Sequence, residues 1–180
     1  MRASILAALL AALAGPAAAH PHAYVDQQAL LSVGPDGAEV RLVIVPSAAE
    51  GPAILAHLDG DGDGFVSDAE AEAFGAEVLA ETELRVDGEP LPLILADAKV
   101  ADPAAVAAGI GAIEVTAEAS FGSLGPGAHR VDFAVSHGSF SHGWFVQPFL
   151  GRDLAKAGAP VVERSEDGAR ASVAFTLPVR

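Results

Sequence analysis

The chain has 180 residues, with 10 lysines and arginines against 24 aspartates and glutamates, and its formal net charge is −14 at pH 7. A surface this acidic repels nucleic acid and anionic lipid, and neither is therefore an expected partner. The length suits one domain with a substantial core, and the sequence contains no cysteine, which excludes a fold held by disulfides.

The first nineteen residues have the composition of an export signal. Arg2 precedes an apolar run over 3–14, a Gly-Pro break and three alanines before His20. A run of about twelve apolar residues is too short to span a hydrocarbon core, which needs about 20. We therefore expect cleavage before His20 and a single mature domain over 20–180. It should work in a periplasm or outside the cell, without stable insertion into a membrane.

Alternating apolar residues predict the first two strands, over 24–33 and 38–46, joined by a turn at 34–37. Helical patterns follow. A short helix is expected to begin at Ser47 or Pro52, and a second helix to run over 67–81.

Strand patterns return at 84–86 and 91–100, and a loop with one helical turn is expected over 102–108. Residues 113–121 alternate, with Ile113 and Val115 inward and Glu114 outward. Further strands are predicted at 129–136, 144–149, 161–164 and 171–179. This succession predicts a mainly β fold, specifically an antiparallel β-sandwich. The helix–loop–helix unit, at about 47–82, is inserted between its second and third strands.

Between the two predicted helices, residues 59–70 read DGDGDGFVSDAE. Acidic side chains stand at loop positions 1, 3, 5 and 12, with a glycine at position 6 where the chain must bend. Position 7 offers a backbone carbonyl and position 9 a hydroxyl. A hard dication such as Ca²⁺ takes several oxygen ligands at once, so this spacing predicts a calcium site. The expected ligands are Asp59, Asp61, Asp63, Phe65 (through its carbonyl), Ser67 and Glu70.

The segment 52–82 resembles an EF-hand, including an apolar Val66 at loop position 8. The resemblance implies that Glu70 binds the ion through both oxygens and that Ser67 binds directly or through a water. The pair Ser67 and Glu70 also fits a helix capping box, which is compatible with metal binding. The first helix is short, and no second loop of this kind is present in the sequence. We therefore expect a structural site rather than a cooperative sensor.

Two groups of histidines suggest a second metal. His20 and His22 flank a proline at the expected mature N-terminus, where the α-amine and two imidazoles could bind Cu²⁺, Ni²⁺ or Zn²⁺. His137 and His142 belong to a repeated Ser-His-Gly between two strand patterns. A hairpin loop there would bring both imidazoles to one ion. The alternative is that they are solvated turn residues.

The His-Pro-His start, the acidic loop and the β-strands that follow are similar to a family of bacterial periplasmic proteins of unknown function. These proteins are often encoded beside nickel, cobalt or zinc transport systems. The likeness spans most of 20–180, but only His20 to His22 and the loop 59–70 are specific to it. It implies an alternative function, periplasmic transition-metal binding or assistance to transport, with a membrane metal transporter as partner.

Nothing in the sequence favours an enzyme. Serine precedes histidine at Ser136 and Ser141, but the chain has no Gly-x-Ser-x-Gly elbow, Walker loop, dinucleotide fingerprint or zinc-protease helix motif. A hydrolase is therefore the least favoured reading. Trp144 and Phe145, which open an apolar strand, are expected in the core.

Overall fold

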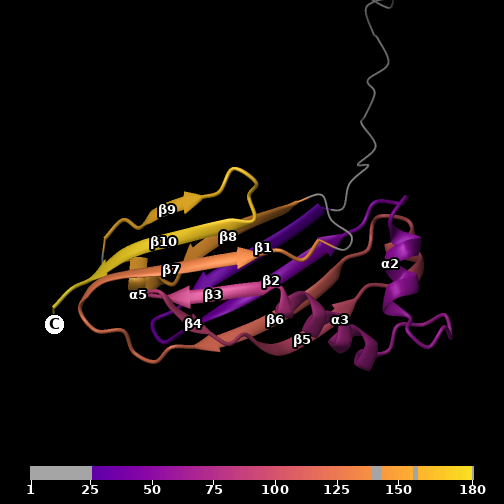
Figure 1. Cartoon of the computed structure of the whole chain (residues 1–180), viewed down its shortest axis with the longest axis horizontal. Helices are drawn as coiled ribbons and strands as arrows, with labels where there is room; N and C mark the ends of the chain where they lie inside the picture. The colour runs from indigo at the N-terminus through magenta and orange to yellow at the C-terminus, as the bar shows by residue number, and fades with distance from the viewer. Residues whose placement is uncertain (1–25, 139–142, 156–157, 180) are drawn as a thin grey trace, which may run out of the picture.

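The computed structural model describes residues 26–138, 143–155 and 158–179 (Figure 1). The fold is mainly β, and the described strands form two five-stranded sheets. Sheet A has the strand order β5-β6-β2-β1-β8, and sheet B has the order β4-β3-β7-β10-β9. Sheet A contains β1 (Asp26–Val33), β2 (Gly37–Val45), β5 (Ile94–Val100), β6 (Ile113–Ser120) and β8 (Trp144–Leu150). Sheet B contains β3 (Thr82–Val86), β4 (Glu89–Leu91), β7 (Gly127–Val135), β9 (Val161–Arg164) and β10 (Arg170–Leu177).

Strand pairing is antiparallel except at β1 and β8, which run parallel from Gln27 opposite Trp144 to Val33 opposite Leu150. The expectation of purely antiparallel pairing is therefore wrong for this pair. The expected hairpin between residues 136 and 143 is wrong as well, because β7 belongs to sheet B and β8 to sheet A. A chain that changes sheet is not bound by the tight turn that makes sequential strands antiparallel.

The single strand expected over 91–100 is in fact two strands in different sheets. β4 pairs with β3 in sheet B, whereas β5 pairs with β6 in sheet A. Pro92 lies between them and has no N–H to donate to a ladder, so the chain leaves one sheet there and enters the other.

The core follows the period of two that the sequence predicts. Along β6 the side chains of Ile113, Val115, Ala117 and Ala119 are buried, and the intervening residues are more exposed. Buried side chains from both sheets belong to one hydrophobic cluster. Burial of this kind is worth roughly 25 cal/mol for each Å² of apolar surface removed from water, so the cluster is the main source of stability.

Two helices, α2 (Gly51–Leu58) and α3 (Asp68–Ala80), lie between β2 and β3 in the chain, as predicted. Figure 1 shows them at the end of the molecule opposite the C-terminus. Ile54 and Leu58 of α2 join the core cluster, and so do Phe74 and Val78 of α3. Two short helices follow, α4 (Pro103–Ala107) and α5 (Arg152–Ala155).

Glycines allow both helices of the pair to pack closely against neighbouring elements. A Cβ at Gly75 of α3 would lie 3.1 Å from Leu95 Cδ1 and 3.4 Å from Val115 Cγ1, so the helix approaches β5 and β6 as closely as a bare backbone allows. At the start of α2, a Cβ on Gly51 would lie 2.3 Å from the carbonyl oxygen of Val106. The loop that joins α2 to α3 is therefore held at both ends by packed helices.

Among the helices of the described ranges, none has both the length and the apolar character that crossing a membrane requires.

Candidate metal centre

Three carboxylates converge in the loop between α2 and α3. Asp59, Asp61 and Asp63 each offer one oxygen, and these oxygens all lie within 4.8 Å of one another. Asp59 is half-buried, and the other two are exposed. Among the described residues, no lysine, arginine or histidine forms an ion pair with any of the three. Three anions held this close repel one another unless a cation lies between them.

Backbone N–H groups hold these carboxylates in place. Asp59 accepts hydrogen bonds from the amides of Asp63 (3.0 Å) and Gly64 (2.9 Å). Asp61 accepts from Asp63 at 3.1 Å, and Asp63 Oδ1 accepts from the amide of Phe65 at 2.8 Å. These short-range bonds are typical of aspartate in turns, and they fix where the carboxylates point.

The loop bends where glycine is required. Gly62 has φ of 74° and Gly64 has φ of 87°, in the left-handed region that other residues avoid. Gly64 is loop position 6, the position where the sequence predicts a sharp turn.

Glu70 lies in the first turn of α3 and reaches back into the loop. Its Oε1 accepts hydrogen bonds from the amides of Gly60 (2.8 Å) and Asp61 (3.3 Å). Its Oε2 accepts from the amide and the hydroxyl of Ser67, each at 2.8 Å. The predicted capping box is confirmed, because Ser67 Oγ in turn accepts from the amide of Glu70. The hydrogen bond from the Ser67 amide is the main cause that lowers the pKa of Glu70, so its carboxylate is ionised at neutral pH.

The remaining predicted ligands are the backbone carbonyl of Phe65 and the hydroxyl of Ser67, and this hydroxyl is hydrogen-bonded to Glu70. The Phe65 side chain has no oxygen and is exposed to solvent, so only its backbone carbonyl could serve as a ligand. The next residue, Val66, packs against the core cluster, which anchors the loop to the domain. The donor set contains carboxylate, carbonyl and hydroxyl oxygens and no nitrogen or sulfur. Such a set suits Ca²⁺ or Mg²⁺ better than a soft transition metal.

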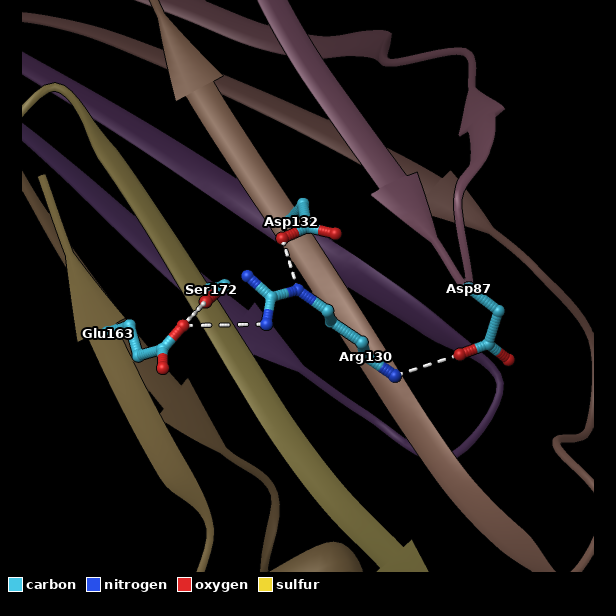
Figure 2. A network of polar contacts seen from close by, with 5 residues as sticks. All are labelled: Asp87, Arg130, Asp132, Glu163 and Ser172. Carbon is cyan, nitrogen blue, oxygen red and sulfur yellow. Dashed lines mark hydrogen bonds and ion pairs between the residues drawn. The ribbon is translucent and has the colours of Figure 1, made fainter.

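A second group of carboxylates, on sheet B, shows the contrasting case (Figure 2). There Arg130 donates to Asp132 Oδ1 at 2.7 Å and to Glu163 Oε2 at 3.5 Å, and its backbone amide donates to Asp87 at 2.8 Å. Ser172 also donates to Glu163, at 3.4 Å. The Arg130 side chain therefore pairs with Asp132 and Glu163, and Asp87 pairs with His129. Each of these acids has a basic partner, so they have less need of an added cation than the loop 59–70.

His129 and Asp87 form an ion pair that sequence reasoning missed. His129 Nδ1 lies 2.8 Å from Asp87 Oδ2, and Nε2 lies 2.8 Å from the carbonyl oxygen of Gly125. Both partners are acceptors, so this position favours the protonated imidazole, which donates from both ring nitrogens. The carboxylate of Asp87 raises the pKa of His129, and His129 in turn lowers the pKa of Asp87. The sequence shows an Asp-Gly turn at residues 87 and 88, but this turn does not identify His129 as the partner of Asp87.

His137 is buried, only 1% exposed, so the alternative of a solvated turn residue is wrong for it. Its ring packs edge-on against Phe74 at 5.9 Å between centroids, and Nδ1 lies 4.0 Å from Glu81 Oε1. Neither ring nitrogen has a hydrogen-bond partner in the described part of the chain. Phe74 also contacts the ring of His57, whose Nε2 lies 2.8 Å from Glu77 Oε2. The other predicted ligands of a transition metal, His20, His22 and His142, fall outside the described residues.

Comparison of the chain with protein-family models, curated proteins and solved structures gave no match.

Proposed function

We propose that this protein binds one calcium ion in the loop 59–70, as an exported binding or structural module and not as an enzyme. The observation that supports it most directly is the convergence of the Asp59, Asp61 and Asp63 oxygens within 4.8 Å with no basic partner in the described chain. Glu70 is available as a fourth carboxylate, and the carbonyl of Phe65 and the hydroxyl of Ser67 bring the donor set to the six or more oxygens that Ca²⁺ takes.

The role of the ion is structural. We infer that sheets A and B form a β-sandwich and that α2, the loop and α3 form an EF-hand-like unit seated at one end of it. An ion bound by Asp59 at the end of α2 and by Glu70 at the start of α3 ties the two helices together. Calcium at about ten times its dissociation constant adds about 1.4 kcal/mol to the free energy of unfolding, which is useful to a domain but too little for a large switch.

Calorimetric titration with Ca²⁺ of the wild type, Glu70→Gln and Asp68→Asn tests the proposal. Glu70→Gln should weaken binding at least about tenfold, which is about 1.4 kcal/mol of binding free energy. Asp68→Asn is the matched control, because it removes one charge two residues earlier, from a side chain that forms no ion pair with another described residue and is not an expected ligand. Equal losses in the two variants would mean that overall charge, and not a ligand, governs binding.

One observation favours a second candidate function, the binding of a transition metal at the same end of the molecule. The buried imidazole of His137 has two ring nitrogens without partners and a carboxylate 4.0 Å away. The metal-transport resemblance makes a membrane transporter the corresponding partner. Titration with Zn²⁺, Ni²⁺ or Cu²⁺ in saturating calcium should then give a second binding event. The event should weaken in His137→Phe and in the double variant His20→Ala, His22→Ala, and its absence at micromolar metal would rule this function out.

A further inference from the structure

The outer face of sheet A has rows of side chains that cross all five strands, and one row differs from its neighbours. The strand register places Ile94 opposite Glu118, Glu118 opposite Glu39, Glu39 opposite Ser32, and Ser32 opposite Phe149. All five side chains are exposed. The row therefore runs without interruption from one edge strand, β5, to the other, β8, whose places in the sheet can be followed in Figure 1.

Glu39 and Glu118 stand directly opposite one another without a counter-charge. Side chains in directly opposed positions of an antiparallel pair have Cβ atoms about 5 Å apart, so two like charges there repel. Within the described residues, neither glutamate forms an ion pair with a lysine, arginine or histidine.

The next two rows along the strands are balanced in charge. The next row pairs Asp97 with Thr116 and Thr116 with Arg41, and the row beyond it pairs Lys99 with Glu114. Ion pairs join Arg41 to Glu114 and Lys99 to Asp97. Each of these rows thus has one acidic and one basic side chain, whereas the row of Glu39 has two acidic ones and no basic one.

The unbalanced row lies in a groove of about 780 Å³. Asp36 adds a third carboxylate to the lining, and no lysine, arginine or histidine lines the groove. Ile94 is 63% exposed and Phe149 is 45% exposed, so the two ends of the row are apolar and open to solvent. The groove therefore offers negative charge in its middle and apolar contact at its ends.

These features select the kind of occupant. A single metal ion is not favoured, because within the described chain only Asp59, Asp61 and Asp63 bring three such ligand atoms within 4.8 Å. A second copy of this chain, with its net charge of −14, would meet the groove with like charge. Four strand spacings of about 4.8 Å separate the apolar ends by about 19 Å, which an extended segment of six or seven residues spans.

We propose that this groove is a docking site for a segment of another protein that bears two basic side chains between apolar ones. The basic side chains lie over Glu39 and Glu118, and the apolar ones lie against Ile94 and Phe149. The site is separate from the calcium loop and does not depend on it.

The test uses the full chain in excess calcium and an amidated probe peptide, Leu-Ser-Arg-Ser-Arg-Ser-Phe. Two-dimensional NMR should show amide shifts confined to residues near 32–39, 94, 118–120 and 149–151. The double variant Glu39→Gln, Glu118→Gln should weaken binding at least about tenfold, since both ion pairs are lost. The matched control, Glu83→Gln with Glu163→Gln, removes the same charge from sheet B and should leave the affinity within about twofold, because it touches no contact of the groove.

Two further probes separate charge from apolar contact. Replacing both arginines of the peptide by glutamate should abolish binding, and replacing its leucine and phenylalanine by serine should weaken it. Three results would overturn the proposal: no binding of the probe at millimolar concentration, equal weakening in the two double variants, or shifts confined to residues 59–70. Removal of the opposed charges should not unfold the sheet, and a melting curve of each variant checks this.

Discussion

The carboxylate of Glu70 accepts a hydrogen bond from the backbone amide of Gly60, ten residues earlier in the chain, at 2.8 Å. The second oxygen of the same carboxylate is held by Ser67. One side chain at the start of α3 thus closes the acidic loop onto itself. It stands beside three aspartates whose mutual repulsion a bound cation would relieve.

Calcium should stabilise the folded protein. With calcium at about ten times its dissociation constant, the free energy of unfolding should rise by about 1.4 kcal/mol over that in a chelator, because the ion binds the folded loop and not the unfolded chain. Differential scanning calorimetry should show a melting temperature higher by a few degrees. In Glu70→Gln, whose affinity should be at least about tenfold weaker, this gain should fall to about 0.4 kcal/mol or less at the same calcium concentration. Equal melting temperatures for the wild type would rule out a structural role of the ion.

Gly75 should tolerate no large side chain. A Cβ added there would lie 3.1–3.4 Å from atoms of Leu95, Ala98 and Val115, so Gly75→Leu overpacks the contact between α3 and sheet A. We expect a loss of about 1–3 kcal/mol in the free energy of unfolding, measured by urea denaturation. Ala76→Leu, the same side chain at the next and exposed position of α3, should change stability little. A leucine at position 75 that is as well tolerated as one at position 76 would show that the helix sits loosely on the sheet.

The His129–Asp87 pair should make stability depend on pH. The pKa of His129 is raised above its ordinary 6.5, so the stabilisation is complete below about 6.5 and is lost as the pH rises through the raised value. The pKa of Asp87 is lowered below 3.8, so the same pair is lost on the acid side only as the pH falls through that lowered value. Urea midpoints of the wild type and His129→Gln should therefore differ more at pH 6 than at pH 9. A difference that is the same at both pH values would mean that the imidazole stabilises by packing alone.

His137→Phe should fold and should be at least as stable as the wild type at neutral pH. The substitution keeps an aromatic edge against Phe74 and removes two ring nitrogens that have no partner, and an unsatisfied buried polar group costs about 1–3 kcal/mol. The reverse exchange at another buried site, Phe133→His, should destabilise. If His137→Phe proved strongly destabilising in urea denaturation, the imidazole would have to be hydrogen-bonded in solution.

The local features of this chain are readable from the sequence because their causes are local. The convergence of the loop aspartates, the cap formed by Ser67 and Glu70, and the alternation from Ile113 to Ser120 each depend on residues close together in the chain. The helix pair was predicted for the same reason, because the spacing of apolar residues within α2 and within α3 predicts the buried face of each helix.

What the sequence does not reveal is which distant segments meet. A strand pattern does not specify the sheet it joins, so the change of sheet at Pro92 and the parallel pairing of β1 with β8 were missed. Phe145 was expected in the core but is 51% exposed, because it lies on the outer side of an edge strand. His137 was placed wrongly for a related reason, as it is buried by Phe74 from a helix more than sixty residues away.

The measurement that tests the calcium assignment most directly is a calcium titration followed by two-dimensional ¹H–¹⁵N NMR. Four backbone amides donate to the loop carboxylates, those of Gly60, Asp63, Gly64 and Phe65. Their NMR signals should shift until one equivalent of Ca²⁺ is bound. The signals of the strands in both sheets should stay unchanged. The same amides should shift clearly less in Glu70→Gln at that concentration, because its affinity should be at least about tenfold weaker. Unmoved loop amides at millimolar calcium, or shifts located elsewhere in the domain, would contradict the calcium assignment.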